Sequence, residues 1–227
     1  TYLNLQCMKK MILSAVMLVF AASGRAQEAG AASPTEHNEW LTTFEAVAVD
    51  ADLDIKFVKV PDTEAPKIVY DTKGSYTSKY DSRRPDRTQV TVYYNTLQSV
   101  SLSGAAAVFE GTVDAVLLDL TLGRKASLTA AFDVKDLRME LTGGSSATLT
   151  GKAGYLTLFA STGRVAASGL EVMSAEVNAQ SKADVSLWIT DRFIGKTTTN
   201  ARITYKGQPA VVRGGAKFMG GEISHVE

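Results

Sequence analysis

Short stretches in which apolar and polar residues alternate recur along most of this 227-residue chain. One series starts at Ala107-x-Phe109-x-Gly111 and continues at offsets of 19, 21, 18, 18 and 18 residues, at Ala126, Ala147, Val165, Ala183 and Ala201. A second series is spaced by 19 residues throughout and starts at Leu118, Leu137, Leu156 and Ala175. Strict alternation is typical of half-buried strands, so each period holds two short strands.

A unit of this length has no room for a helix and cannot bury its apolar face alone. We therefore expect the units to stack as coils of a parallel β-solenoid. Glycines and serines at 143–146, in "TGGSSATLTG", and Gly104, Gly123 and Gly163 fall between strands, where the backbone must turn sharply. The prediction is one all-β domain over residues 41–227, with about six coils from about residue 97.

The segment before the repeat also alternates. In "AVAVDADLDIKFV" the apolar residues from Val47 to Phe57 fall on one face, which predicts one long half-buried strand. Two further strands are expected at residues 67–71 and 89–94, joined as a hairpin by a polar loop that contains Pro85.

The first 26 residues read as a leader with a signal peptide. Met8 is a plausible start, Lys9 and Lys10 supply the positive charge, and an apolar stretch over residues 11–24 is too short to span a membrane. Cleavage after Ala26 would leave residues 27–40 as a linker and would remove Cys7, the only cysteine. We expect an exported protein of the periplasm, the cell surface or the extracellular space, with no transmembrane segment in its mature chain.

Several classes of function find no support in the sequence. The chain has 24 basic and 24 acidic residues and no long basic run, which argues against a nucleic-acid partner. "TGGSSATLTG" lacks the spacing of a phosphate-binding loop, so no nucleotide or other cofactor is predicted. Asp50, Asp52 and Asp54 alternate along a strand and suggest calcium, but such side chains do not converge around an ion, so no metal site is predicted.

If the coils stack, outward residues form rows, and one row consists of hydroxyl residues. The repeat alignment places Thr129, Thr150, Ser168, Ser186 and Thr204 in this row, which is the candidate binding face. A flat row of hydroxyls can bind sugars or ordered water, but serine and threonine are also common on the solvent side of exposed strands that bind nothing. A second row is expected to hold Arg138, Thr157, Glu176 and Lys196, with an ion pair between Glu176 and Lys196.

Catalysis needs side chains that converge, and no such group is visible. His37 and His225 lie near the two ends of the mature chain, outside the repeat. Glu140 is the only acid in its expected row of Thr121, Glu140, Phe159, Asn178 and Thr198. We therefore predict no catalytic residues and no enzyme. A polysaccharide-active β-helix lyase or hydrolase is the competing interpretation, and a purely structural role stays open.

The order of these elements resembles one known family. "VDADLDIKFV", a hairpin ending in "VTVYYN", the corners "SLSGAAAV" and "TGGSSATL", and the closing "ARITYKGQPAVVRGGAKFMGG" are similar to the putative autotransporter adhesin, head GIN domain family. The resemblance implies a right-handed parallel β-helix and export, and it supplies no function and no catalytic residues. Our leading interpretation is a non-catalytic cell-envelope or surface protein, an adhesin or binding module that presents a repetitive face to a polysaccharide or protein, with a homo-oligomer left open. Basic residues replace small ones at some corners, namely Arg124, Lys125, Arg164 and Lys182.

Overall fold

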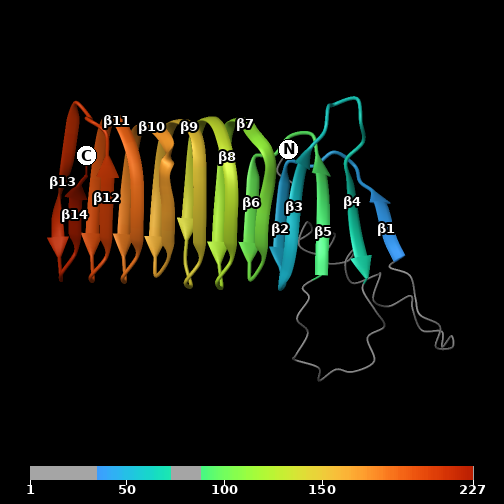
Figure 1. Cartoon of the computed structure of the whole chain (residues 1–227), viewed down its shortest axis with the longest axis horizontal. Coiled ribbons are helices and arrows are strands. Elements are labelled where there is room, and N and C mark those ends of the chain that lie inside the picture. The colour runs from blue at the N-terminus through green and yellow to red at the C-terminus, as the bar shows by residue number, and fades with distance from the viewer. Residues whose placement is uncertain (1–34, 73–87, 227) are drawn as a thin grey trace, which may run out of the picture.

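The computed structural model of the protein describes residues 35–72 and 88–226 (Figure 1). The expected leader and signal peptide, most of the expected linker, and the hairpin loop with Pro85 lie outside these residues. The described part of the chain forms fourteen strands and no helix. The strands are β1 (Thr35–Trp40), β2 (Ala46–Asp50), β3 (Leu53–Lys59), β4 (Lys67–Thr72), β5 (Thr88–Tyr94), β6 (Ser99–Ser103), β7 (Ala106–Gly123), β8 (Ser127–Leu141), β9 (Ser146–Ser161), β10 (Arg164–Gln180), β11 (Asp184–Thr198), β12 (Arg202–Lys206), β13 (Val211–Phe218) and β14 (Glu222–His225).

The strands wind into a β-solenoid of about six turns, as the repeat predicts. Each long strand from β7 to β11 pairs in parallel with the next along both of its halves, so one coil lies directly on another. We call the side built from β3, the first halves of β7 to β11, β12 and β14 face A. Face B is built from β2, β6, the second halves of the long strands, and β13.

Face A continues beyond the first coil as a flat sheet. β5 adds to β3 in parallel, β4 adds to β5 antiparallel, and β1 adds to β4 antiparallel. The predicted hairpin is therefore confirmed as β4 and β5. Figure 1 shows these strands side by side at the N-terminal end of the solenoid, so the outer surface of face A crosses eleven hydrogen-bonded strands.

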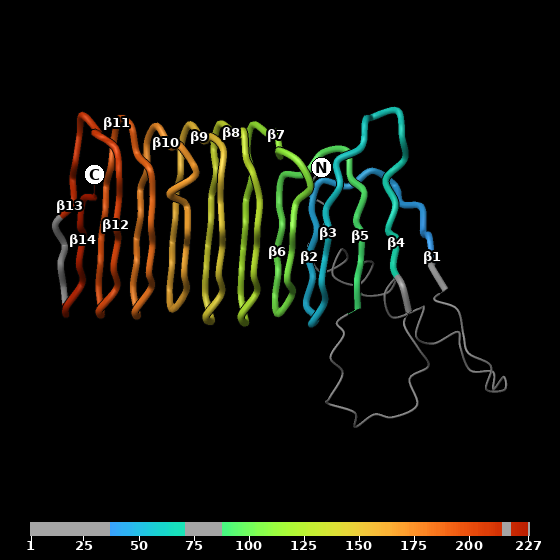
Figure 2. Tube along the Cα trace, in the orientation of Figure 1, coloured from blue at the N-terminus to red at the C-terminus, as the bar shows by residue number. Residues whose placement is uncertain are grey.

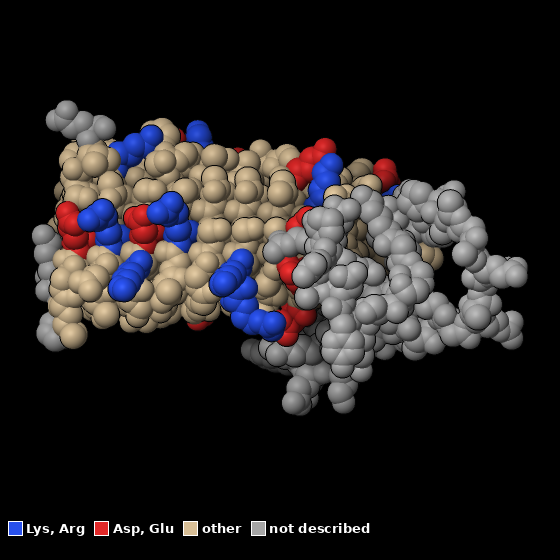
Figure 3. Space-filling model, turned by 60° about the horizontal axis from the view of Figure 1, so that its bottom comes forward, with Lys and Arg blue, Asp and Glu red and all other residues tan. Residues whose placement is uncertain are grey.

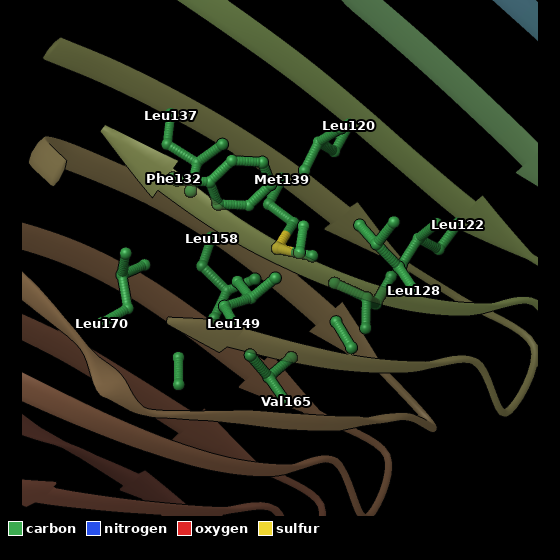
Figure 4. Close-up of a cluster of buried hydrophobic side chains, with 14 of the residues drawn as sticks. Leu120, Leu122, Leu128, Phe132, Leu137, Met139, Leu149, Leu158, Val165 and Leu170 are labelled. Carbon is green, nitrogen blue, oxygen red and sulfur yellow. The ribbon is translucent and has the colours of Figure 1, made fainter. Parts of the chain in front are cut away.

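The interior is filled by the apolar residues of the alternating pattern. Leu118, Leu137 and Leu156 lie on adjacent coils, and each is no more than 2% exposed, as the second repeat series predicts. Figure 4 shows such side chains meeting between the two faces. At the N-terminal end of the interior three aromatic rings pack together. Phe57 is stacked on Phe109 at 4.5 Å, and Tyr94 is edge-on to both. Burial of these side chains is the main source of stability in such a coil.

The corners that lead from face B back to face A are tight turns with left-handed backbone. Five of them, at residues 124–125, 143–144, 181–182, 199–200 and 219–220, have two residues with φ between 52° and 82°, whereas the corner at 162–163 has only Thr162 in this region, with φ of 55°. Figure 2 shows these corners aligned along one edge. Only the turn at 143–144 has glycine at both positions, and glycine alone adopts this conformation without steric cost. The fold tolerates non-glycine residues here because the paired coils on either side impose the turn.

Two expectations for the N-terminal region need correction. The long strand predicted from Val47 to Phe57 is two strands, β2 on face B and β3 on face A, which bend at residues 51–52. Alternation continues through the bend because both strands face the same interior, and the solenoid therefore begins near residue 46, not near residue 97. Residues 35–40, expected as the end of a linker, form strand β1 because β4 offers them a free edge.

Candidate binding surface

A row of small and hydroxyl residues runs along the middle of the outer surface of face A. Between β8 and β14 this middle row consists of Thr129, Thr148, Ala166, Ser186, Thr204 and Ser224. Val108 of β7 and Lys56 of β3 continue it toward the N-terminal end. Ser127 and Ser146 lie beside it on the same surface. Within the described residues, the hydroxyls of Thr129 and Thr148 make no hydrogen bond, so both are available to a ligand.

The middle row brings together only part of the predicted hydroxyl row. Thr129, Ser186 and Thr204 lie in it. The neighbour of Thr129 on the next coil is Thr148, however, and Thr150 lies outside the middle row, where it pairs with Ala131 and Gly169. Ser168 lies in an irregularity between Ala167 and Glu171, and Ser186 pairs with Ala166. The alignment is wrong by two residues at these coils because shifts in register of the paired strands change the length of single coils.

Charged side chains of alternating sign form a second row at the edge of face A, over its C-terminal half. Arg164, Asp184, Arg202 and Glu222 are consecutive partners in the parallel strands. Arg164 reaches Asp184 at 3.5 Å and Arg202 reaches Glu222 at 3.2 Å, and all four side chains are largely exposed. Figure 3 shows this alternating row beside a surface that carries no charged side chain. The row is neutral as a whole and sets one boundary of the uncharged surface.

Ion pairs also border the N-terminal end of that surface. Lys56 Nζ lies 2.6 Å from Glu110 Oε2, and the hydrogen bond to this carboxylate raises the pKa of Lys56. At the corner of the first coil, Arg124 Nη1 donates a 2.6 Å hydrogen bond to Asp50 Oδ1. Arg124 and Arg164, two of the basic corner residues, therefore carry compensated charges.

Face B carries a mixture of charged, polar and aromatic side chains. Arg138, Thr157 and Glu176 are adjacent as predicted, but Glu176 is next to Ile194, and the expected ion pair with Lys196 does not form. Lys196 lies beside Asn178, in the row of Glu140. The prediction placed Thr198 there; it is wrong by two residues because the last coils shift register. Glu140 lies between Thr121 and Phe159, with no second carboxylate beside it in its row.

The two histidines lie at opposite ends of the solenoid. His37 on β1 stacks on Tyr70 at 5.1 Å, and burial together with nearby Glu39 raises the pKa of Tyr70. His225 on β14 packs on Tyr205, and its Nε2 lies 2.7 Å from the carbonyl oxygen of Gly207. Each histidine therefore packs against a tyrosine ring, His37 in the sheet that extends face A and His225 in the last coil.

Acidic, cysteine and histidine side chains in the described residues form no group of three or more that could hold a metal ion. Asp50 ends β2, Asp52 lies in the bend and Asp54 is in β3, so the chain turns between them. Nor does any helix in residues 35–72 and 88–226 have the length and apolarity to cross a membrane.

An aromatic row that the sequence did not reveal lies on the N-terminal part of face A. Trp40 of β1, Lys67 of β4 and Tyr93 of β5 are consecutive partners across three strands. The Lys67 ammonium lies 5.4 Å from the Trp40 ring centroid and 4.7 Å from that of Tyr93. Trp40 is 68% exposed. We call these three residues the aromatic row. The alternation of Val90, Val92 and Tyr94 turns Tyr93 outward, but no sequence signal pointed to Trp40, which was expected in a linker.

A second tryptophan takes part in a similar contact near the other end. Trp188 lies inside β11, and Lys206 Nζ lies 4.6 Å above its ring. Its partner on the preceding coil is the acidic residue Glu171. Tyr155 on face B is 56% exposed and was not predicted, whereas Phe159, in the outward row of Glu140, is half-buried.

The fold and surface define a class of protein: a β-solenoid module with long outer faces. The model of the family described as "Putative auto-transporter adhesin, head GIN domain" matches residues 66–209, more than half of the chain. The chain belongs to this family. No curated protein matches the sequence.

Solved structures share the fold. A putative adhesin from Bacteroides fragilis NCTC 9343 superposes with a TM-score of 0.73 at 17% identity, over 86% of this chain and 97% of that one. A putative adhesin from Parabacteroides merdae ATCC 43184 superposes with a TM-score of 0.57 at 18% identity, over 87% of this chain and 98% of that one. A putative lipid binding protein from Parabacteroides distasonis ATCC 8503 superposes with a TM-score of 0.59 at 13% identity, over 86% of this chain and 97% of that one.

Proposed function

We propose that this protein is an exported, non-catalytic binding module of the cell envelope that presents the outer surface of face A to a polysaccharide. The observation that carries the proposal is the middle row. It places available hydroxyls on a flat surface next to small residues. A charged row borders this surface along one edge, and the ion pair of Lys56 and Glu110 lies at its N-terminal end. A flat, uncharged, hydroxyl-bearing surface suits an extended polymer of hydroxyl groups.

The dimensions of face A agree with such a ligand. Eleven neighbouring strands span about 50 Å at the usual strand spacing, which is long enough for an extended chain of many sugar units. The interior of the solenoid is packed with apolar side chains, so a ligand must bind on the outside. Adhesin relatives and the apolar stretch at residues 11–24 support export to the envelope.

The binding test compares two matched triple variants of the purified protein. Thr129→Val, Thr148→Val and Thr204→Val remove three hydroxyls from the middle row and keep the shape and strand preference of each side chain. Thr121→Val, Thr157→Val and Thr198→Val make the same change on face B. Retention is measured on columns of immobilised neutral and acidic polysaccharides, and release of new sugar ends is assayed at the same time.

We expect the face A variant to lose at least about tenfold in affinity, because each of the three lost hydrogen bonds contributes about 0.5–1.5 kcal/mol. The face B variant should bind like the original protein. Equal behaviour of the two variants, or no retention by any polysaccharide, would contradict the proposal. New sugar ends would support the competing hypothesis of a polysaccharide-active enzyme.

A further inference from the structure

We infer that the aromatic row of Trp40, Lys67 and Tyr93 is a binding site for acidic sugar units, which gives the protein a preference for a carboxylate-bearing polysaccharide. This inference deepens the proposed function and rests on it, because it takes the partner of face A to be a polysaccharide. It depends on different residues, however, and can fail separately.

The geometry of the row suits a sugar ring. Trp40 and Tyr93 are two strands apart, about 10 Å at the usual strand spacing, and both point outward from the same flat sheet. The C–H groups on one face of a pyranose pack well on an aromatic ring. Trp40, which is 68% exposed, offers an aromatic surface to such a ring.

The cation between the rings adds selectivity. Contacts with both ring faces hold the Lys67 ammonium in place. No carboxylate in residues 35–72 and 88–226 forms an ion pair with it, whereas Lys56 is paired with Glu110 on the same sheet. Aromatic quadrupoles attract the ammonium but leave its net charge uncompensated. A carboxylate on a sugar stacked against either ring would complete the arrangement.

Trp188 and Lys206 provide an internal comparison. They form the same kind of contact, at 4.6 Å, but with a single ring, and Glu171 occupies the adjacent position on the neighbouring coil. A carboxylate there repels an acidic ligand. The two tryptophans, which are the only ones in the chain, therefore mark a site that should bind acidic sugars and one that should not.

The site continues the surface assigned to the polymer. Trp40, Lys67 and Tyr93 stand one row from Asn38, Val69 and Thr91, which extend the middle row onto β1, β4 and β5. A polymer lying along the middle row would therefore pass beside the aromatic rings.

The test uses tryptophan fluorescence with two single-tryptophan proteins. Trp188→Phe leaves Trp40 as the reporter, and Trp40→Phe leaves Trp188. Each is titrated with polygalacturonate and with its methyl ester, which keeps the backbone and removes the charge. We expect a saturable change in Trp40 emission with polygalacturonate, a much weaker one with the ester, and none from Trp188. Lys67→Met should weaken the response about tenfold, and Lys206→Met should leave it unchanged.

Equal responses of Trp40 to the acid and the ester, no response to either, or equal effects of Lys67→Met and Lys206→Met would overturn the inference. Circular dichroism of each variant shows whether its fold is intact. If neutral polysaccharide is still retained through the middle row, the proposed function survives and only the acidic preference is lost. If no polysaccharide of any kind is retained, both proposals fail.

Discussion

The carbonyl oxygen of Phe132 occupies the space that a side chain on Gly151 would need. Gly151 lies in the bend of β9 between faces A and B, with φ of +101°, and packs directly under the bend of β8. Because the coils are stacked in register, neither backbone can move without disturbing its neighbours.

Gly151→Ala should therefore destabilise the protein by roughly 2–4 kcal/mol, through steric conflict added to an unfavourable φ. Gly111 is a matched control, since it has φ of +77° but no atom lies within 4 Å of the place that a Cβ on it would take. Gly111→Ala should cost only about 1–2 kcal/mol. Urea unfolding measures both, and equal losses would mean that the close approach to Phe132 has no energetic weight.

The left-handed corners offer sites for stabilisation. Thr199 is β-branched and has φ of 54° in the turn at 199–200, a conformation that glycine adopts at no steric cost. We expect Thr199→Gly to raise the free energy of unfolding by about 0.5–1 kcal/mol. Asn200→Gly, at the next position, should have a smaller effect because asparagine tolerates this region. A thermal melt in which Thr199→Gly lowers the midpoint would contradict this account of the corner.

A hydroxyl at the C-terminal end of the interior lacks a partner. Thr197 is completely buried, and among the described residues its Oγ1 makes no hydrogen bond. Thr197→Val should stabilise the protein by about 1 kcal/mol or more, because the desolvated hydroxyl is removed while the shape is kept. Thr157→Val, an exposed change on face B, should stay within about 0.5 kcal/mol of the original protein. Chemical denaturation decides, and a destabilised Thr197→Val protein would show that the hydroxyl is satisfied.

Burial of the Tyr94 side chain raises its pKa to about 12. The unfolded chain has the ordinary value of about 10, so the folded state holds the proton more tightly. The resulting stability is fully present below pH 10 and is lost as the pH rises from 10 to 12. Relative to Tyr94→Phe, the original protein should lose about 2–3 kcal/mol over this window. Unfolding of both proteins at pH 9 and pH 12 measures the difference, and parallel losses would exclude Tyr94 as the cause.

Face B was predictable in register from the sequence for most of its length. Leu118, Leu137, Leu156 and Ala175 lie side by side at constant spacing, as the second repeat series predicted. Each position carries a side chain that can only face the interior, and the strands between the corners have equal length. Where bulges change the length of a coil, as between Ala167 and Glu171, the same reasoning failed.

The sequence by itself determined that the chain alternates with a period of two, turns at small residues and stacks as a solenoid. It could not determine which outward residues are neighbours. A shift of one residue between paired strands would bury polar side chains and is excluded by the pattern, but a shift of two residues keeps the same side chains inside and fits the pattern equally well. Thr129 therefore meets Thr148 and not Thr150. Tertiary structure alone decided that Trp40, Lys67 and Tyr93 meet. β1 pairs antiparallel with β4, and β4 pairs antiparallel with β5, so residues from three separate segments of the sequence become neighbours.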